Sequence, residues 1–191
     1  GDGAGKYLNG LTSFNVNDID IDFDPESGYF TLPFTIDFSI SCVYENSKIK
    51  MANGKEKMAK EISKGDMVKT NKGKSKVRCV LKTKLIENKG YFIELDSGLL
   101  ITPWHPVRIN GEWVFPVHNS SKFVMKKSEA VYSFLLENDH VLLIDGTEVC
   151  GLAHNFKGNV IEHEYYGTNK VVEDLQKMDG WDNGLVELQQ G

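Results

Sequence analysis

The sequence carries nucleophilic, acid–base and amide side chains at three widely separated points. Cys42 opens the segment CVYENSKIK, Thr102 and His105 share the motif TPWHP, and the pair His154 and Asn155 closes the segment EVCGLAHN. A thiol can attack a carbonyl carbon, and an imidazole can move the proton that such an attack involves. A side-chain amide can attack its own backbone carbonyl. Each of these residue types can therefore take part in chemistry at a carbonyl or an amide if the fold brings them together.

Cys42 has the simplest chemistry of these residues. Cys42 directly follows the Ser41–Cys42 peptide bond, so its sulfur can attack the Ser41 carbonyl through a five-membered ring and form a thioester. A free thiol with a pKa of about 8.5 is only a few per cent thiolate at neutral pH, so a nearby base or proton relay is needed. His105 is the candidate for that role.

Each of these residues also has a structural interpretation. A free cysteine is among the most buried residue types, so Cys42 could simply belong to a strand core. Thr102 and His105 could be packing or surface residues. Asn155 could occupy a turn, because asparagine tolerates the left-handed backbone conformation that turns require.

Composition limits the class of protein. The 191 residues are 40% hydrophobic and contain no apolar run long enough to cross a membrane. The three cysteines, Cys42, Cys79 and Cys150, are odd in number and widely spaced, which suggests neither a disulfide framework nor a metal knuckle. We therefore expect a reducing, cytoplasmic compartment, with no membrane partner, no metal and no cofactor.

Charge is divided unevenly along the chain. Residues 46–89 hold fourteen Lys or Arg against four acidic residues, whereas the segments on both sides are acidic. A basic block of this kind can bind nucleic acid, but here the lysines are spread over strand-like segments with few aromatic residues to stack on bases. We expect a solvated basic face and no nucleic-acid partner.

Strand-like segments dominate the pattern. Alternating or β-branched runs are separated by NG, KG, SG and DG turns every eight to twelve residues or so, which is typical of an all-β domain. Short helices are predicted at residues 55–63 and 170–178. The segment from 42 to 155 is predicted to be one domain, with flanking segments able to pack on it.

The order of these motifs resembles that of a Hint domain, the self-processing module of inteins and hedgehog proteins. A cysteine, an NG turn and EISKGDMV resemble the start of such a domain, LLITPWHPV supplies its TxxH motif, and VYSFLLENDHVLLIDGTEVCGLAHN resembles its closing blocks. The segments TPWHPVRINGEWVFP and EVCGLAHNF, with the C-terminal segment that follows them, resemble the Vint subgroup, whose members are attached to von Willebrand A domains.

The resemblance implies an all-β, pseudo-symmetric horseshoe with short helices, on which the flanking segments pack. Three parts are expected: an N-terminal β segment at 1–41, the autoprocessing domain at 42–155 and a Vint-like extension at 156–191. The substrates are then the flanking segments themselves. A von Willebrand A domain is expected in the same full-length chain.

The resemblance also assigns roles. His105 would protonate the departing nitrogen of Cys42, and Thr102 would hydrogen-bond the tetrahedral intermediate or the distorted amide. Asn155 would cyclise and cut the Asn155–Phe156 bond, assisted by His154. His140 in NDHVLLIDG is a second candidate assistant at that bond.

Three departures limit this mechanism. Phe156 is not a nucleophile, so standard protein splicing is disfavoured. Thr83 stands where the hedgehog branch has an aspartate that activates a sterol, which argues against cholesterol transfer. Ser133 stands where inteins commonly have a helping aspartate. What remains is a Ser41 thioester resolved by water, a small thiol or an amine of another protein.

Other interpretations are open. The chain could be a non-catalytic Hint-fold interaction module in which Cys42, Thr102 and His105 are remnants. Cys42, His105, Cys150 and His154 could instead converge on a metal, although their spacing gives that reading little support. A cysteine hydrolase acting on external substrates is the remaining alternative.

Overall fold

The chain folds almost entirely into antiparallel strands in a computed structural model that describes residues 13–16, 19–24, 29–31, 35–37 and 41–190. Side chains are described from residue 41 onward. The strands before that point are β1 (Ser13–Val16), β2 (Ile19–Asp24), β3 (Tyr29–Thr31) and β4 (Thr35–Asp37), which pair in sequence order as an antiparallel sheet. Strand β1 approaches β14 of the main sheet.

Within the described residues, the strands from β5 onward form one fourteen-stranded hydrogen-bonded sheet. They are β5 (Val43–Tyr44), β6 (Lys48–Lys50), β7 (Glu56–Met58), β8 (Met67–Thr70), β9 (Gly73–Lys84), β10 (Lys89–Glu94), β11 (Leu100–Ile101), β12 (Val107–Ile109), β13 (Glu112–Val114), β14 (Phe123–Lys127), β15 (Ala130–Leu136), β16 (Val141–Ile144), β17 (Thr147–Cys150) and β18 (Leu185–Gln189).

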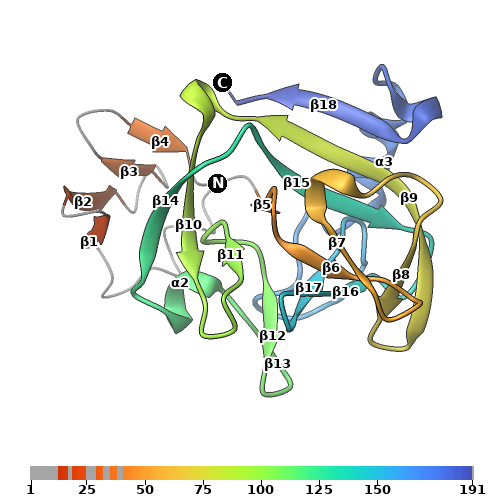
Figure 1. Ribbon diagram of the computed structural model, residues 1–191, viewed down its shortest axis with the longest axis horizontal. Helices are drawn as coiled ribbons and strands as arrows, with labels where there is room; N and C mark the ends of the chain where they lie inside the picture. The colour runs from red at the N-terminus through yellow and green to blue at the C-terminus, as the bar shows by residue number, and fades with distance from the viewer. Residues whose placement is uncertain (1–12, 17–18, 25–28, 32–34, 38–40, 191) are drawn as a thin grey trace.

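The long strand β9 joins the two halves of this sheet. Its first residues pair with β8, and its remaining residues pair with β15 (Figure 1). The inward side chains of β9 alternate with exposed ones along its first half, which is the period expected of a strand with one buried face. The largest buried cluster includes Val77 and Val80 of β9 and draws on both halves. The predicted all-β architecture is therefore confirmed.

Helices are few and short. They are α2 (Pro116–Asn119) and α3 (Asn169–Leu175), with single 3-10 turns at Ala59–Glu61, Ile86–Asn88 and Trp181–Asn183. The predicted helix at 170–178 is confirmed by α3, whose Thr168 hydroxyl accepts a hydrogen bond from the Lys170 N–H at its start. The predicted helix at 55–63 is wrong. Strand β7 and one 3-10 turn occupy that range, because pairing of β7 with β6 overrides weak helix propensity.

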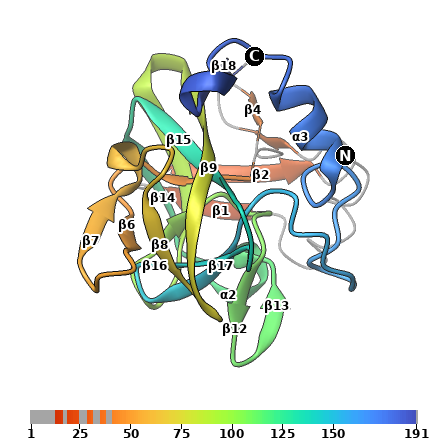
Figure 2. The same ribbon diagram turned by 90° about the vertical axis from the view of Figure 1, so that its right-hand side faces the viewer.

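The C-terminal segment packs on the domain. Strand β18 runs parallel to β9, from Leu185 opposite Val80 to Gln189 opposite Lys84 (Figure 1). Helix α3 lies on the same side of the molecule (Figure 2) and buries Val171, Val172 and Leu175 in a cluster that also holds Leu152 and Ala153. The segment therefore covers the end of the core domain, next to His154 and Asn155.

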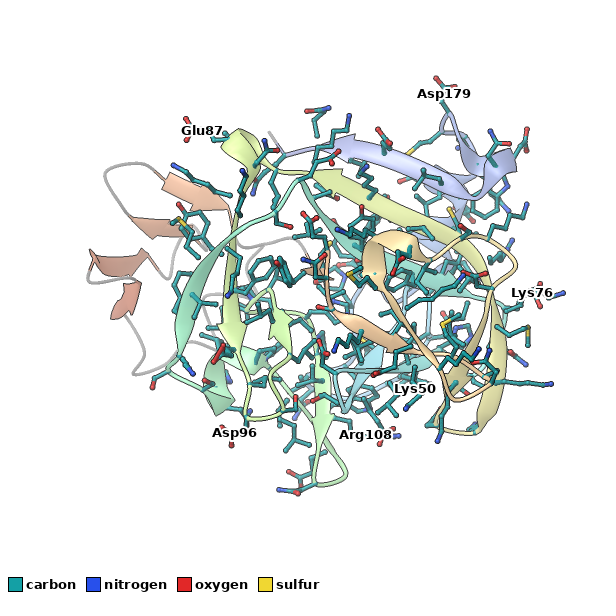
Figure 3. All side chains as sticks on the ribbon, in the orientation of Figure 1. Lys50, Lys76, Glu87, Asp96, Arg108 and Asp179 are labelled. Carbon is teal, nitrogen blue, oxygen red and sulfur yellow. The ribbon has the colours of Figure 1, made fainter. Side chains whose placement is uncertain are left out.

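The charged surface matches the expected solvated basic face. Lysines of the basic block form surface ion pairs, among them Lys82 with Glu129 and Lys84 with Glu187. Charged side chains such as Lys76 and Glu87 point outward at the edge of the molecule (Figure 3). None of the helices in the described part of the chain is long and apolar enough to span a membrane.

Candidate functional site

Strand order brings the first two sequence motifs together. The short strand β5 begins directly after Cys42 and lies between β15 and β11, where Val43 pairs with Tyr132 on one side and Ile101 on the other (Figure 1). Thr102 follows β11. The Ser41–Cys42 bond thus enters the sheet between β15 and the loop that carries the TxxH motif.

The groups of this peptide bond are held by side chains from both neighbours. The Cys42 N–H donates to the Thr102 hydroxyl oxygen at 2.9 Å, and the Thr102 N–H donates to the Cys42 carbonyl at 3.0 Å. On the other side the Ser133 hydroxyl donates to the Ser41 carbonyl oxygen. The same Ser133 oxygen lies 3.2 Å from the Cys42 sulfur. Nitrogen, carbonyl oxygen and sulfur therefore all have a fixed neighbour.

The thiol of Cys42 is held in its neutral form. Only 3% of the residue is exposed, and burial raises the thiol pKa to about 12, against smaller opposing effects of the Ser133 and Thr83 hydroxyls. Thr83 and Ser133 are themselves buried. Sulfur chemistry here must therefore begin from a thiol, because the thiolate is rare at neutral pH.

His105 lies against the same bond with a defined tautomer. Its Nε2 is 2.8 Å from the Cys150 carbonyl oxygen, and since a carbonyl can only accept, Nε2 carries the proton of the neutral ring. Nδ1 is buried and has no hydrogen-bond partner among the described residues. Burial lowers the His105 pKa, and the backbones of Cys150 and Ser41 partly oppose that effect. Nδ1 is therefore an unoccupied basic nitrogen beside the Ser41 backbone.

A cavity of about 820 Å³ adjoins this arrangement. Ser41, His105, Cys150 and His154 line one part of it, and Trp104 and Phe115 add aromatic surface. The C-terminal segment supplies the opposite wall with residues 159–167 and Lys170. The Ser41 carbonyl is thus next to a space that a small molecule or a side chain could enter.

The second predicted junction lies at the edge of the same region. Asn155 is exposed, has a φ of 59°, and its side-chain nitrogen donates to the Ala153 carbonyl at 3.1 Å. The Phe156 N–H, which belongs to the Asn155–Phe156 bond, donates to Nδ1 of His154 at 2.8 Å. His154 is buried and stacks on the Phe156 ring with centroids 4.8 Å apart.

The protonated forms of the histidines near the Asn155–Phe156 bond are disfavoured. Burial, with smaller contributions from the neighbouring His105, His140 and His163 rings, lowers the pKa of His154 to about 4. Gly167 of the C-terminal segment packs closely against the His154 ring. A Cβ at this position would lie 3.1 Å from His154 Cε1 and 2.8 Å from the His163 carbonyl oxygen. The half-buried His140 has a lowered pKa because of burial, and its Nδ1 has no partner among the described residues.

Residues 41–191 match the family model of the Vint Hint-domain. The chain belongs to the Vint family of Hint domains. The match begins at the residue before Cys42 and includes the whole C-terminal segment, so the extension that walls the cavity is part of the family pattern.

Solved structures similar to this Vint domain include inteins. The gp41-1 intein shares 16% identity over 59% of this chain and 100% of its own, with a TM-score of 0.47. The DnaB intein from Synechocystis sp. PCC 6803 shares 17% identity over 59% of this chain and 99% of its own, also with a TM-score of 0.47. No curated protein matches the chain.

Sequence reasoning underestimated two residues of this Vint domain. Ser133 and Thr83 were interpreted as the loss of aspartate helpers, yet both hydroxyls act on the Cys42 thiol and Ser133 also contacts the Ser41 carbonyl. Their place across from Cys42 depends on the register of β15 and β9, with Val131 opposite Thr83, which no local motif reveals. Cys150, considered for a metal, contributes its carbonyl to His105 instead.

The metal alternative has no matching geometry in the described residues. Across the described part of the chain, no group of three or more His, Cys, Asp or Glu side chains is placed to hold a metal ion. The three cysteines are free and buried in this region of the structure.

Proposed function

We propose that this Vint domain breaks its own Ser41–Cys42 peptide bond by an N-to-S acyl shift. Membership of the Hint domains supports a self-processing role in general. The observation that carries the specific proposal is the set of contacts on this one bond. Thr102 accepts from its N–H, Ser133 donates to its carbonyl oxygen, and the attacking sulfur lies 3.2 Å from the same Ser133 oxygen.

In this reaction the Cys42 sulfur bonds to the Ser41 carbonyl carbon, and the bond from that carbon to the Cys42 nitrogen breaks. The thiol proton ends on the departing nitrogen, which leaves as an amine. His105 is the proton donor for that nitrogen, and it must first take up a proton at Nδ1, since its neutral ring carries its proton on Nε2. Thr102 accepts a hydrogen bond from the Cys42 N–H and so fixes the orientation of the Ser41–Cys42 amide.

The product thioester is less stable than the amide, so the shift goes forward only when an acceptor captures the acyl group. The cavity beside Ser41 and His105 gives water, a small thiol or a primary amine access to that carbon. Water would release residues 1–41 as an acid. A lysine amine of another protein would form an amide and yield a conjugate.

Hydroxylamine tests this proposal, because it converts a thioester into a stable hydroxamate. We expect residues 1–41 to be released with a hydroxamate on Ser41 from the wild-type chain. Cys42→Ala should remain intact, and the matched control Cys79→Ala, which removes another buried thiol, should react like wild type. Absence of the hydroxamate from folded wild-type protein would favour the non-catalytic interaction module.

Cyclisation of Asn155 is a second candidate, favoured by the contact of His154 Nδ1 with the Phe156 nitrogen. In that reaction the Asn155 side-chain nitrogen bonds to its own carbonyl carbon, and the bond to the Phe156 nitrogen breaks. His154 must be protonated to donate to this nitrogen, and its pKa of about 4 makes that rare at neutral pH. Release of residues 156–191 on incubation near that pH, absent from Asn155→Ala, would support this activity.

A further inference from the structure

We propose that the Ser133 hydroxyl is a catalytic proton relay between the Cys42 thiol and the Ser41 carbonyl oxygen. This inference rests on the acyl shift proposed above and names the residue that makes the attack possible. It gives Ser133 a positive role in place of the missing aspartate of the resembling inteins.

Three atoms form the relay in an unbroken chain. The Ser133 hydroxyl proton is committed to the Ser41 carbonyl oxygen, so the Cys42 S–H is the donor in the 3.2 Å contact with the Ser133 oxygen. Thus S–H donates to O–H, which donates to O=C. The direction of every hydrogen bond matches the direction in which protons move when sulfur attacks the carbonyl.

The relay solves a geometric problem of the neutral reaction. A thiol that adds to a carbonyl without ionising must deliver its proton to the carbonyl oxygen, and direct delivery passes through a strained four-membered ring. With the Ser133 hydroxyl included, the ring of sulfur, carbonyl carbon, two oxygens and two protons has six members. The donor to the carbonyl oxygen also stabilises the charge that develops there.

The surroundings favour this neutral route over a thiolate. The titratable group facing the bond is His105, which burial keeps neutral, and the groups acting on the thiol are the Ser133 and Thr83 hydroxyls. The charged groups on the strands around the Ser41–Cys42 bond form ion pairs and therefore do not act as a base for the thiol. They are Lys82 and Lys84 of β9, Glu129 before β15, Glu187 of β18 and Glu45 after β5.

Atoms and charges balance through the whole shift. The S–C bond forms as the thiol proton passes to the Ser133 oxygen and the Ser133 proton passes to the carbonyl oxygen, which gives a neutral tetrahedral intermediate. The hydroxyl proton of the intermediate then passes to Nδ1 of neutral His105, and His105 passes a proton to the Cys42 nitrogen as the C–N bond breaks, which restores the carbonyl and the neutral ring. No oxidant, reductant or added base takes part.

The test compares Ser133→Ala with the matched variant Ser128→Ala, which removes another buried hydroxyl that donates to the Ala130 carbonyl at 2.7 Å. Release of the hydroxamate is followed by intact mass, at hydroxylamine concentrations where the rate no longer rises, so that the acyl shift limits the rate. Ser133→Ala should be slower by about 100- to 1000-fold, and Ser128→Ala should match wild type. Thermal melting establishes that both variants are folded.

The pH profile of the wild type gives a readout that a merely structural role would not change. Between about pH 6 and about pH 9 the relay predicts a rate that stays level or falls, whereas attack by a thiolate predicts a rise of about tenfold per pH unit. If Ser133→Ala does not fold, the wild-type rate in mixtures of light and heavy water tests whether two protons move in the rate-limiting step. Two protons in flight give a curved dependence on deuterium fraction, and one gives a straight line.

Several results would overturn the relay alone: wild-type speed in folded Ser133→Ala, a tenfold rise per pH unit, or a straight deuterium dependence. Each leaves the acyl shift in place, because hydroxamate still forms. A wild-type chain that never forms hydroxamate would remove the proposed function and the relay together.

Discussion

The two junctions of the core domain differ in what surrounds the bond. At Ser41–Cys42 the nitrogen, carbonyl and thiol contact Thr102 and Ser133 inside the sheet. At Asn155–Phe156 the asparagine is exposed in a left-handed turn, and its amide nitrogen bonds to the Ala153 carbonyl. The first bond therefore has hydrogen-bond partners from two neighbouring segments of the sheet, whereas Asn155 at the second bond occupies a turn.

The histidines beside the two junctions also differ in their hydrogen bonds. His105 offers an unoccupied Nδ1 beside the Ser41 backbone, whereas Nδ1 of His154 already accepts the Phe156 N–H. Both rings are buried, and burial lowers the pKa of both. The comparison teaches that the two rings differ in whether Nδ1 can take up a proton without giving up a hydrogen bond.

The largest expected difference between the junctions concerns His105. His105→Gln keeps a donor for the Cys150 carbonyl but cannot move a proton to the Cys42 nitrogen, so release of residues 1–41 should slow by about 100- to 10,000-fold. Intact mass in hydroxylamine measures the rate. His118→Gln, at an exposed histidine whose ring contacts Phe115, is the control and should react at the wild-type rate. An unchanged rate in His105→Gln would remove this histidine from the reaction.

A smaller effect is expected on stability at the first junction. Thr102→Val keeps the side-chain shape but leaves the buried Cys42 N–H without its acceptor, which should lower the free energy of unfolding by about 1 to 3 kcal/mol. Thr102→Ser retains the hydroxyl and should lose less. Urea unfolding compares them, and equal stability of Thr102→Val and wild type would show that this contact does not hold the bond.

The second junction should make folding sensitive to acid. The folded pKa of His154, about 4, lies below the ordinary histidine value of 6.5, so the unfolded chain takes up the proton first as the pH falls. Stability from this group is complete above about pH 6.5 and is lost as the pH falls to about 4. The full shift corresponds to about 3 kcal/mol, and we expect a loss of about 1 to 2 kcal/mol because solvent screening reduces such effects.

Urea unfolding at both ends of this pH range measures the loss. His154→Asn should reduce the acid sensitivity, and His118→Asn, again the control, should reduce it less. A pH dependence equal to that of wild type in His154→Asn would assign the effect to other groups.

The smallest effect is expected at Asn155. Glycine adopts the φ of 59° without strain, so Asn155→Gly should change the free energy of unfolding by about 0.5 kcal/mol or less and leave release of residues 1–41 unchanged. Asn155→Ala should cost about 1 kcal/mol. If wild type also loses residues 156–191 and Asn155→Gly does not, the second junction is chemically active and the contrast drawn above is wrong.

The sequence predicted the elements of the site better than the contacts within it. Cys42, the TxxH loop and the His154–Asn155 pair could be found because each is a short motif in a fixed order. Alternation and turn residues predicted the strands because both are local patterns, and the helix predicted at 170–178 corresponds to α3. The helix predicted at 55–63 failed because pairing between β6 and β7 is not visible in local propensity.

Contacts across the sheet could not be predicted. Ser133 lies ninety-one residues from Cys42, and their meeting depends on β5 pairing with β15 in one register. The cavity wall formed by the tail likewise depends on packing of α3 and on β18 joining β9. A shift of one residue in either register would turn the same side chains to the opposite face.

Intact mass of the purified chain over a day at neutral pH, with and without dithiothreitol, tests the central claim most directly. Wild type should lose residues 1–41 in a thiol-dependent manner, and Cys42→Ala should keep its full mass. Full mass in both folded proteins, even after prolonged exposure to the thiol, would contradict cleavage at Ser41–Cys42 and leave the Hint-fold interaction module as the better account.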